Sequence, residues 1–129
     1  MSKPVLYRII LPVNDIDAAE RFYSTVLQDT GERVSPGRHY FNCGGTILAC
    51  YDPDADGDDP GEGWRHHANQ YIYFSVTGLE AALQRVQEAG GAIDQPIAQM
   101  PWGETMFYAR DPFGNPISCV DSETLFRGN

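Results

Sequence analysis

The chain has 129 residues and a formal net charge of −9, with 42% hydrophobic and 12% aromatic residues. This length and composition fit one globular domain and exclude a disordered chain. The negative charge argues against nucleic acid and anionic membrane surfaces as partners, because both would repel the protein.

The cysteines and the N-terminal segment indicate the compartment. Cys43, Cys50 and Cys119 include no closely spaced pair, which argues against a disulfide framework and against a zinc motif. The first apolar run ends by Asn14, so it is too short to span a membrane. It also lacks the small-residue cleavage site of a signal peptide. We therefore expect a soluble cytoplasmic protein with reduced thiols.

The first half of the chain is predicted to contain a strand, a helix and two more strands. Residues 5–13 form an apolar run of strand-forming residues, and residues 16–27 place apolar side chains at the spacing of one helical face. Residues 28–36 are predicted as a turn region. Residues 37–43 and 46–51 are predicted as antiparallel strands, because a Gly-Gly pair between them is typical of a tight hairpin.

The second half repeats this pattern. Val76 matches Val13, so the strand-then-helix unit returns 63 positions later (76 minus 13), as a strand at 71–76 and a helix at 79–89. Three further strands are predicted, one that begins at residue 92 and is limited by Pro96, one at 104–110 and one at 116–120. Residues 111–115, Asp-Pro-Phe-Gly-Asn, form a strong turn. Each half is therefore predicted as a β-α-β-β-β module.

Both helices carry the same signal at their start. Asn14 is followed three residues later by Asp17, and Thr77 is followed by Glu80. An N-cap residue followed by an acid at this spacing satisfies free helix N–H groups and complements the helix dipole. We therefore predict Asn14 and Thr77 as the two N-caps.

An acidic linker separates the two modules. We predict a single domain, residues 1–129, with module one at 4–51, the linker at 52–69 and module two at 70–125. Four linker residues match early positions of an EF-hand calcium loop, Asp52, Asp54, Asp56 and Gly57. The twelfth position is Gly63 instead of the required Glu, so the sequence favours a solvated connection over a calcium site.

The repeated unit resembles the vicinal oxygen chelate superfamily, which includes glyoxalase I, extradiol dioxygenases, fosfomycin-resistance enzymes and bleomycin-resistance proteins. The resemblance rests on the strand-to-helix unit that ends in Phe22-Tyr23, on its echo at 71–90 and on the turn at 111–115. It implies the α+β glyoxalase/bleomycin-resistance fold, in which two tandem βαβββ modules form an open barrel-like cleft. It also implies a homodimer.

The resemblance further implies a divalent metal in that cleft. The family ligands are a His or Gln five residues before the strand's closing Val in each module, and a Glu in the last strand of each module. Here Arg8, Tyr71 and Ser118 occupy three of these positions, and the fourth lies near Ala49. None is a usual ligand, and a fixed guanidinium repels a metal ion. We therefore predict no metal and no other cofactor. The alternative is Zn, Ni, Mn or Fe held by non-standard ligands.

The histidines offer no obvious replacement for the missing ligands. His66 and His67 are adjacent, so on an extended chain they point in opposite directions, and His39 is distant in sequence. We expect surface or packing roles for all three.

Five residues are predicted to contact a small-molecule ligand: Arg8, Tyr71, Trp102, Tyr108 and Ser118. Arg8 would hold a carboxylate, phosphate or carbonyl group, and aromatic side chains line drug-sized pockets well. Two other interpretations stay open. Arg8 would instead form a salt bridge with a neighbour such as Glu104, and the aromatic residues would instead fill the core.

These observations predict a metal-free small-molecule binding protein with its ligand in the cleft near Arg8. The alternative is a metal-dependent lyase, isomerase or dioxygenase of the same superfamily. A third hypothesis is a metal-free enzyme that uses Arg8 as electrophile, with Glu104 or Tyr71 as acid or base. A fourth is a dimerisation or regulatory module. The sequence leaves open whether any reaction is catalysed, and Glu104 is the weak candidate for a catalytic residue.

Overall fold

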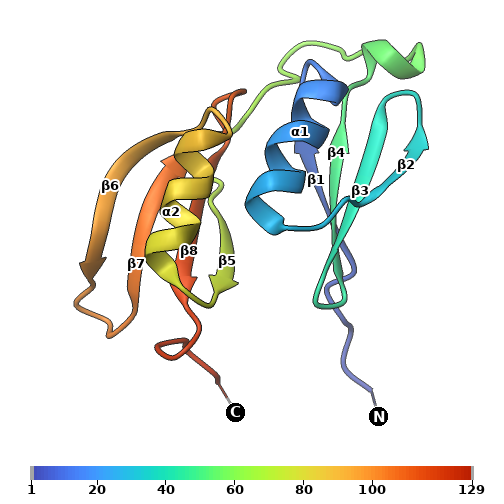
Figure 1. Cartoon of the computed structure of the whole chain (residues 1–129). Coiled ribbons are helices and arrows are strands. Elements are labelled where there is room, and N and C mark those ends of the chain that lie inside the picture. The colour runs from blue at the N-terminus through green and yellow to red at the C-terminus, as the bar shows by residue number, and fades with distance from the viewer. Residues whose placement is uncertain (1, 129) are drawn as a thin grey trace.

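The computed structural model describes residues 2–128 and contains two four-stranded sheets, each with a helix on one face (Figure 1). The first sheet has the order β1-β4-β3-β2. Its strands are β1 (Arg8–Pro12), β2 (Glu32–Ser35), β3 (Arg38–Cys43) and β4 (Thr46–Tyr51), and helix α1 (Ile16–Leu27) follows β1.

The second sheet repeats this topology in the order β5-β8-β7-β6. Its strands are β5 (Ile72–Val76), β6 (Ala92–Gln99), β7 (Thr105–Arg110) and β8 (Pro116–Asp121), and helix α2 (Leu79–Glu88) follows β5. In both sheets the first strand pairs in parallel with the last, and the other pairs are antiparallel. The predicted α+β class and the β-α-β-β-β order of each half are confirmed.

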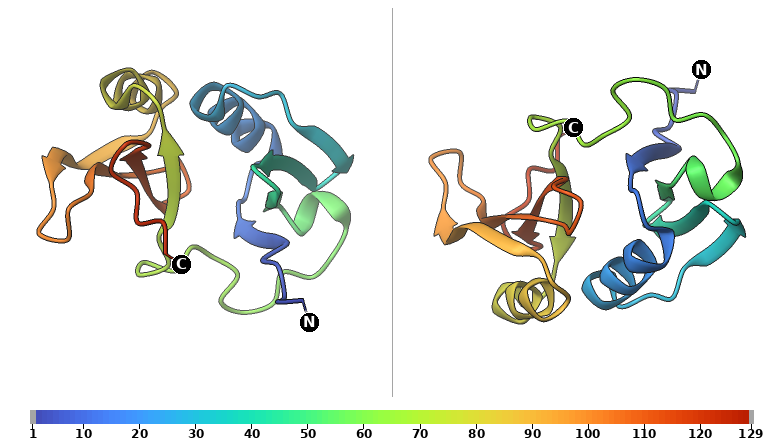
Figure 2. Two further views of the ribbon diagram at one scale, coloured as in Figure 1. Left: turned by 90° about the horizontal axis from the view of Figure 1, so that it is seen from below. Right: turned by 90° about the horizontal axis from the view of Figure 1, so that it is seen from above.

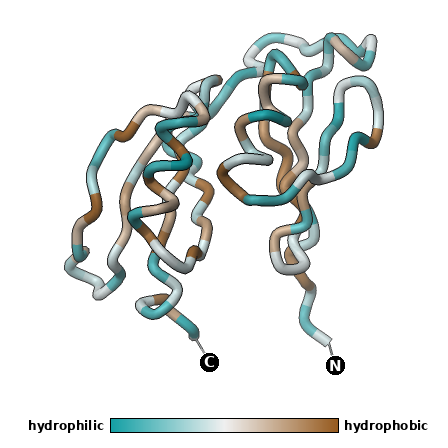
Figure 3. Tube along the Cα trace, in the orientation of Figure 1, coloured by the Kyte–Doolittle hydropathy of each residue, from teal (hydrophilic) through white to brown (hydrophobic). Residues whose placement is uncertain are grey.

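Both helices are amphipathic, and Figure 3 shows hydrophobic and hydrophilic residues alternating along each of them. The apolar residues of α1 recur at the spacing that places them on one face, so they bury together against the sheets. The buried residues of this face are Ile16, Ala19, Phe22, Tyr23 and Val26. Those of α2 are Leu79, Ala82 and Val86. One hydrophobic core includes residues from both modules.

The two modules meet through their helices. Helix α1 packs against α2, and the end-on views show the helices side by side, with a sheet extending away from each (Figure 2). The two sheets are not closed into a barrel. Strand β1 pairs only with β4, and β5 pairs only with β8, so each of these two edge strands has one edge without a partner in the sheets described.

A buried polar network joins the modules. The Tyr23 hydroxyl on α1 donates to Oδ2 of Asp111 at 2.6 Å. Nδ2 of Asn115 donates to the same oxygen at 2.8 Å and to the Pro12 carbonyl at the end of β1 at 2.9 Å. Asp111 and Asn115 are 4% and 2% exposed. The predicted turn at 111–115 therefore connects the second module to the first.

Two strands differ from the sequence prediction. Strand β2 lies inside the segment predicted as a turn. The prediction missed it because its residues are mostly exposed and give no apolar pattern. Strand β6 continues past Pro96 to Gln99. It tolerates this proline because it is an edge strand and its pairing with β7 is irregular between Gln95 and Ala98.

Both predicted N-caps were wrong by one residue. Asp15, rather than Asn14, caps α1, and its carboxylate accepts from the backbone N–H of Ala18 at 3.0 Å. Gly78, rather than Thr77, precedes α2 and has positive φ with no side-chain cap. Aspartate supplies a capping oxygen as readily as asparagine, so a sequence with two adjacent cap residues does not decide between them.

The acidic linker folds back onto the first sheet instead of being wholly solvated. It contains the short 3₁₀ helix η1 (Asp54–Asp56). The Asp56 carboxylate accepts from the Ser35 hydroxyl at 2.8 Å and from the backbone N–H of Gly37 at 2.6 Å, and it pairs with Arg38. These donors already engage the Asp56 carboxylate, which an EF-hand calcium site would need as a ligand.

Replacing Tyr23 by Phe tests the network that joins the modules. The variant removes a hydrogen bond to a buried carboxylate, so we expect the free energy of unfolding to fall by about 1.5–3 kcal/mol in urea titrations. Tyr7→Phe is the matched control, because Tyr7 is 62% exposed, and its change should stay within about 0.5 kcal/mol. Equal stability of the Tyr23 variant and the wild type would contradict the role assigned to this network.

Candidate functional site

Strand alternation places four of the predicted ligand residues, all except Trp102, on the faces of the sheets that lack helices. In β1, Leu11 belongs to the core, so Arg8 points to the opposite face. In β5, Phe74 belongs to the core, so Tyr73 points away from α2. Tyr73 and Tyr108 are the cross-strand neighbours of Ser118 on β8.

Three tyrosines form one cluster on the helix-free face of the second sheet. The ring centroids of Tyr71 and Tyr108 are 5.3 Å apart, and the Tyr73 ring lies 6.3 Å from Tyr108 and 6.4 Å from Tyr71. The hydroxyls of Tyr73 and Tyr108 are 3.3 Å apart. The Tyr108 ring packs edge to face with both other rings, which is a favourable aromatic geometry. Sequence analysis named Tyr71 and Tyr108 as ligand residues but not Tyr73.

Ser118 lies fully buried between two of these tyrosines. Its hydroxyl donates to the Phe107 carbonyl at 3.0 Å and lies 3.8 Å from the Met106 sulfur. Because Ser118 is 0% exposed, its hydroxyl is not accessible to a ligand in this structure.

Arg8 belongs to a separate cluster on the first sheet. Its guanidinium carbon lies 5.1 Å from the centroid of the Tyr7 ring and 5.4 Å from that of Tyr40, and its Nη1 donates to the Tyr40 hydroxyl at 3.2 Å. Such cation–π contacts orient a guanidinium without neutralising it. Arg8 does not pair with Glu104, the salt bridge that the sequence had left open.

Glu104 and Trp102 form a third group. The Trp102 indole N–H donates to Glu104 at 2.9 Å, and the backbone N–H of Phe126 donates to the other carboxylate oxygen at 3.3 Å. Trp102 is 60% exposed. The five predicted ligand residues are therefore divided among three places, and only Tyr71, Tyr108 and Ser118 lie together.

Two further cavities lie elsewhere, in a crevice between the two modules. One cavity of about 610 Å³ is bounded by the end of α1, the β3–β4 hairpin, β5 and Arg85 of α2. A second cavity of about 220 Å³ is bounded by Leu6, Ile9, β4 and the start of β5. No sequence pattern marks this crevice, because its walls come from separate elements and are shaped only when the modules dock.

The donors at the family metal positions do not fit a metal. Arg8 is cationic, and the Ser118 hydroxyl is committed to a backbone carbonyl. Across residues 2–128, no group of three or more His, Cys, Asp or Glu side chains is placed to hold a metal ion. Zinc, iron and similar metals need several such donors converging on one point.

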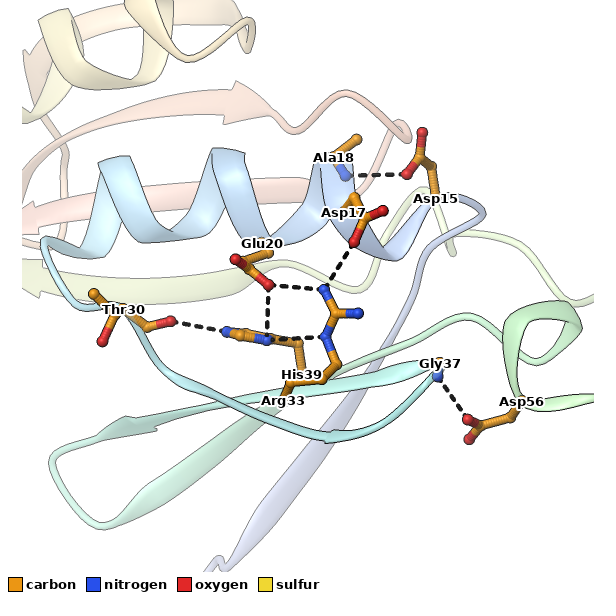
Figure 4. A network of polar contacts seen from close by, with 9 residues as sticks. All are labelled: Asp15, Asp17, Ala18, Glu20, Thr30, Arg33, Gly37, His39 and Asp56. Carbon is orange, nitrogen blue, oxygen red and sulfur yellow. Dashed lines mark hydrogen bonds and ion pairs between the residues drawn. The ribbon is translucent and has the colours of Figure 1, made fainter.

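The histidines are engaged in local packing (Figure 4). Nε2 of buried His39 lies 2.9 Å from the Thr30 carbonyl, and its Nδ1 accepts from Nε of Arg33 at 3.3 Å. Arg33 also pairs with Glu20 and Asp17 of α1. This network holds β2 and β3 against α1. His66 lies against Gly114, and His67 accepts from the backbone of Asn69.

The cysteines are poor nucleophiles in this environment. Burial raises the pKa of Cys50 to about 12 and that of Cys119 to about 11. Burial also raises the pKa of Cys43. Because the thiolate is the reactive form, these thiols remain protonated and unreactive near neutral pH.

The tyrosine cluster gives a testable titration. Desolvation and the hydrogen bond with Tyr108 raise the pKa of Tyr73 to about 12, above the usual value of about 10. The stabilisation linked to Tyr73 is therefore present below pH of about 10 and is lost as the pH rises through about 12. In ultraviolet titrations, Tyr108→Phe should return the Tyr73 pKa toward 10, whereas Tyr7→Phe should not. A wild-type Tyr73 that titrates with the exposed tyrosines would contradict this.

Comparisons with known proteins place the chain in a family. The family model described as Glyoxalase/Bleomycin resistance protein/Dioxygenase superfamily matches residues 6–118. A comparison with curated protein sequences finds no match. Within residues 2–128, no helix has the length and apolar character needed to cross a membrane.

Solved structures share the fold. A glyoxalase-related enzyme from Fulvimarina pelagi has a TM-score of 0.77 at 20% identity, covering 96% of this chain and 92% of that one. A glyoxalase/bleomycin resistance protein from Albidiferax ferrireducens T118 has a TM-score of 0.75 at 19% identity, covering 89% and 96%. A glyoxalase/bleomycin resistance protein/dioxygenase from Nocardioides has a TM-score of 0.71 at 23% identity, covering 100% and 91%. These likenesses show the fold alone. Because the family model spans most of its length, the chain belongs to the Glyoxalase/Bleomycin resistance protein/Dioxygenase superfamily.

Proposed function

We propose that this chain is a metal-free small-molecule binding protein whose ligand is held beside Arg8. The observation that carries the proposal is the chemistry of the family metal positions, where Arg8, Tyr71 and Ser118 stand in place of metal ligands. A guanidinium supplies a fixed positive charge and several N–H donors, so it takes over the ion's role of attracting ligand oxygens.

The surroundings of Arg8 support a binding role. Only one hydrogen bond of its guanidinium, to Tyr40, occurs among residues 2–128, and no ion pair there involves it. Its sequence neighbour Ile9 and its cross-strand partner Ile47 line the 220 Å³ cavity. Ile47 shares the strand face of Arg8, so a ligand whose apolar body contacts Ile47 would present an oxygen to Arg8.

No specific observation favours catalysis. Glu104 is turned toward Trp102 and Phe126 and is not brought beside Arg8 by any contact described above. The metal-dependent alternative would require ligands that the donor set does not supply. The homodimer implied by the resemblance stays a prediction.

Metal analysis separates the proposal from the alternative. We expect purified protein to contain well below one Zn, Ni, Mn or Fe ion per chain, and we expect its binding of the apolar probe anilinonaphthalene sulfonate to be unchanged after dialysis against EDTA. Near-stoichiometric metal whose removal abolishes probe binding would overturn the proposal in favour of a metal-dependent enzyme.

Arg8→Gln tests the ligand position. Loss of the charge should weaken binding of the anionic probe by about 3- to 10-fold, because one charge-assisted hydrogen bond is worth about 1 kcal/mol or more. Arg21→Gln is the control, since Arg21 is exposed on α1 and does not border the cavity. Equal affinities of the Arg8 variant, the control and the wild type would place the ligand elsewhere.

A further inference from the structure

The two cavities of the inter-module crevice adjoin each other. The 610 Å³ cavity and the 220 Å³ cavity share Cys43, Tyr73 and Phe74 in their walls. The smaller cavity extends from there to Leu6 and Ile9, and the larger one reaches Arg85. The volume of the larger cavity alone falls within the range of small-molecule sites.

The two ends of the crevice differ in chemistry. The smaller cavity is lined mainly by apolar side chains, namely Leu6, Ile9, Ile47, Leu48, Ile72 and Phe74. The larger cavity adds polar groups at its far end, including Arg85, Thr77 and Ser75. An apolar channel that ends in a charged group is complementary to an amphiphile. The apolar tail of the ligand is buried against the apolar side chains, and its polar head group pairs with the charged group instead of with water.

Arg85 is the one cationic residue among the described residues that line the larger cavity, so it is the group there that favours an anionic ligand. Arg38 and Arg85 are the half-buried arginines among the residues described. Arg38 pairs with Asp56 and Asp58, whereas in residues 2–128 no ion pair involves Arg85. Its one hydrogen bond joins Nε to the Val26 carbonyl at 3.4 Å. The two terminal nitrogens of its guanidinium therefore remain available to pair with an anion.

One group in the same cavity opposes an anion. Asp29 lines the larger cavity, and its carboxylate accepts from the backbone N–H of Gly31 at 3.2 Å. It lies near enough to Cys43 for its charge to contribute to the raised pKa of that thiol. Within the larger cavity, an anionic head group is therefore favoured at Arg85 and disfavoured near Asp29.

We propose that this crevice binds an elongated amphiphilic carboxylate of the fatty-acid type. The carboxylate pairs with Arg85, and the hydrocarbon chain passes Cys43 and Phe74 toward Leu6 and Ile9. The larger cavity is also bounded by β5, whose second edge has no strand partner in the sheets described. This inference goes beyond the proposed function, because it places the anionic group of a ligand at Arg85 and not beside Arg8.

Calorimetric titration of the full chain with three ligands of equal chain length tests the class. Decanoate, decanol and decyltrimethylammonium, each below its micelle concentration, differ only in the head group. We expect decanoate to bind about tenfold more tightly than decanol, because a half-buried charge pair contributes about 1.4 kcal/mol or more. We expect decyltrimethylammonium to bind most weakly of the three.

Charge variants locate the head group. Arg85→Gln should weaken decanoate about tenfold and leave decanol unchanged, whereas Arg85→Lys should keep most of the preference. Asp29→Asn should strengthen decanoate binding about two- to threefold, because it removes the opposing charge. Arg21→Gln is the control for net charge. Thermal melts show which variants are folded, and Asp29→Asn and Arg85→Lys preserve the test if Arg85→Gln is unstable.

The outcomes distinguish this inference from the proposed function. If anilinonaphthalene sulfonate binds but decanoate binds no better than decanol, the ligand class is wrong and the binding function stands. If decanoate is preferred but neither Arg85→Gln nor Asp29→Asn changes its affinity, the head group does not lie at Arg85 and the inference is overturned. If neither the probe nor any amphiphile binds, both proposals fail.

Discussion

The carboxylate of Asp111 is the constraint on which the arrangement of this chain depends. It belongs to a turn of the second module and accepts from Tyr23 of the first, from the Asn115 side chain and from two backbone N–H groups of its own turn. Burial raises the pKa of Asp111, and these donors act in the opposite direction by stabilising its charged form. A buried carboxylate is tolerated only while all of these donors stay in place, so the network selects one docking geometry of the modules.

This network acts at one end of the first sheet and leaves the other end open. It reaches Pro12, which ends β1 and lies opposite Tyr51 at the end of β4. The larger cavity borders Asn42 and Gly44, at the hairpin that begins β4. The modules are thus fixed where β1 ends and separated where β4 begins. The free edges of β1 and β5 could otherwise pair with another chain. Here they are separated by the inter-module crevice, which has Arg85 at one end.

Much of the fold followed from local patterns in the sequence. Helical spacing located α1 and α2, and the repeat located the paired modules, because both signals depend on which face of an element is buried. Strand β2 was missed because both of its faces are largely exposed, and β6 was cut short because an edge position tolerates Pro96. The candidate site could be predicted less well from the sequence. The family resemblance placed Arg8 and Tyr71 in one cleft, but the distance between clusters on different sheets depends on docking, which no local pattern encodes.

The same limit explains why Arg85 escaped notice. In the sequence it is one cation in an amphipathic helix, between Ala82 and Val86 of the buried face, and such a residue is usually solvated. Docking places it instead beside the last turn of α1, whose carbonyls lack helical partners. In a chain with 18 acidic residues and 9 lysines and arginines, a half-buried guanidinium without a carboxylate partner among residues 2–128 requires an explanation. Its contact with Val26 accounts for the orientation of Nε, and Arg85 also lines the larger cavity of the crevice.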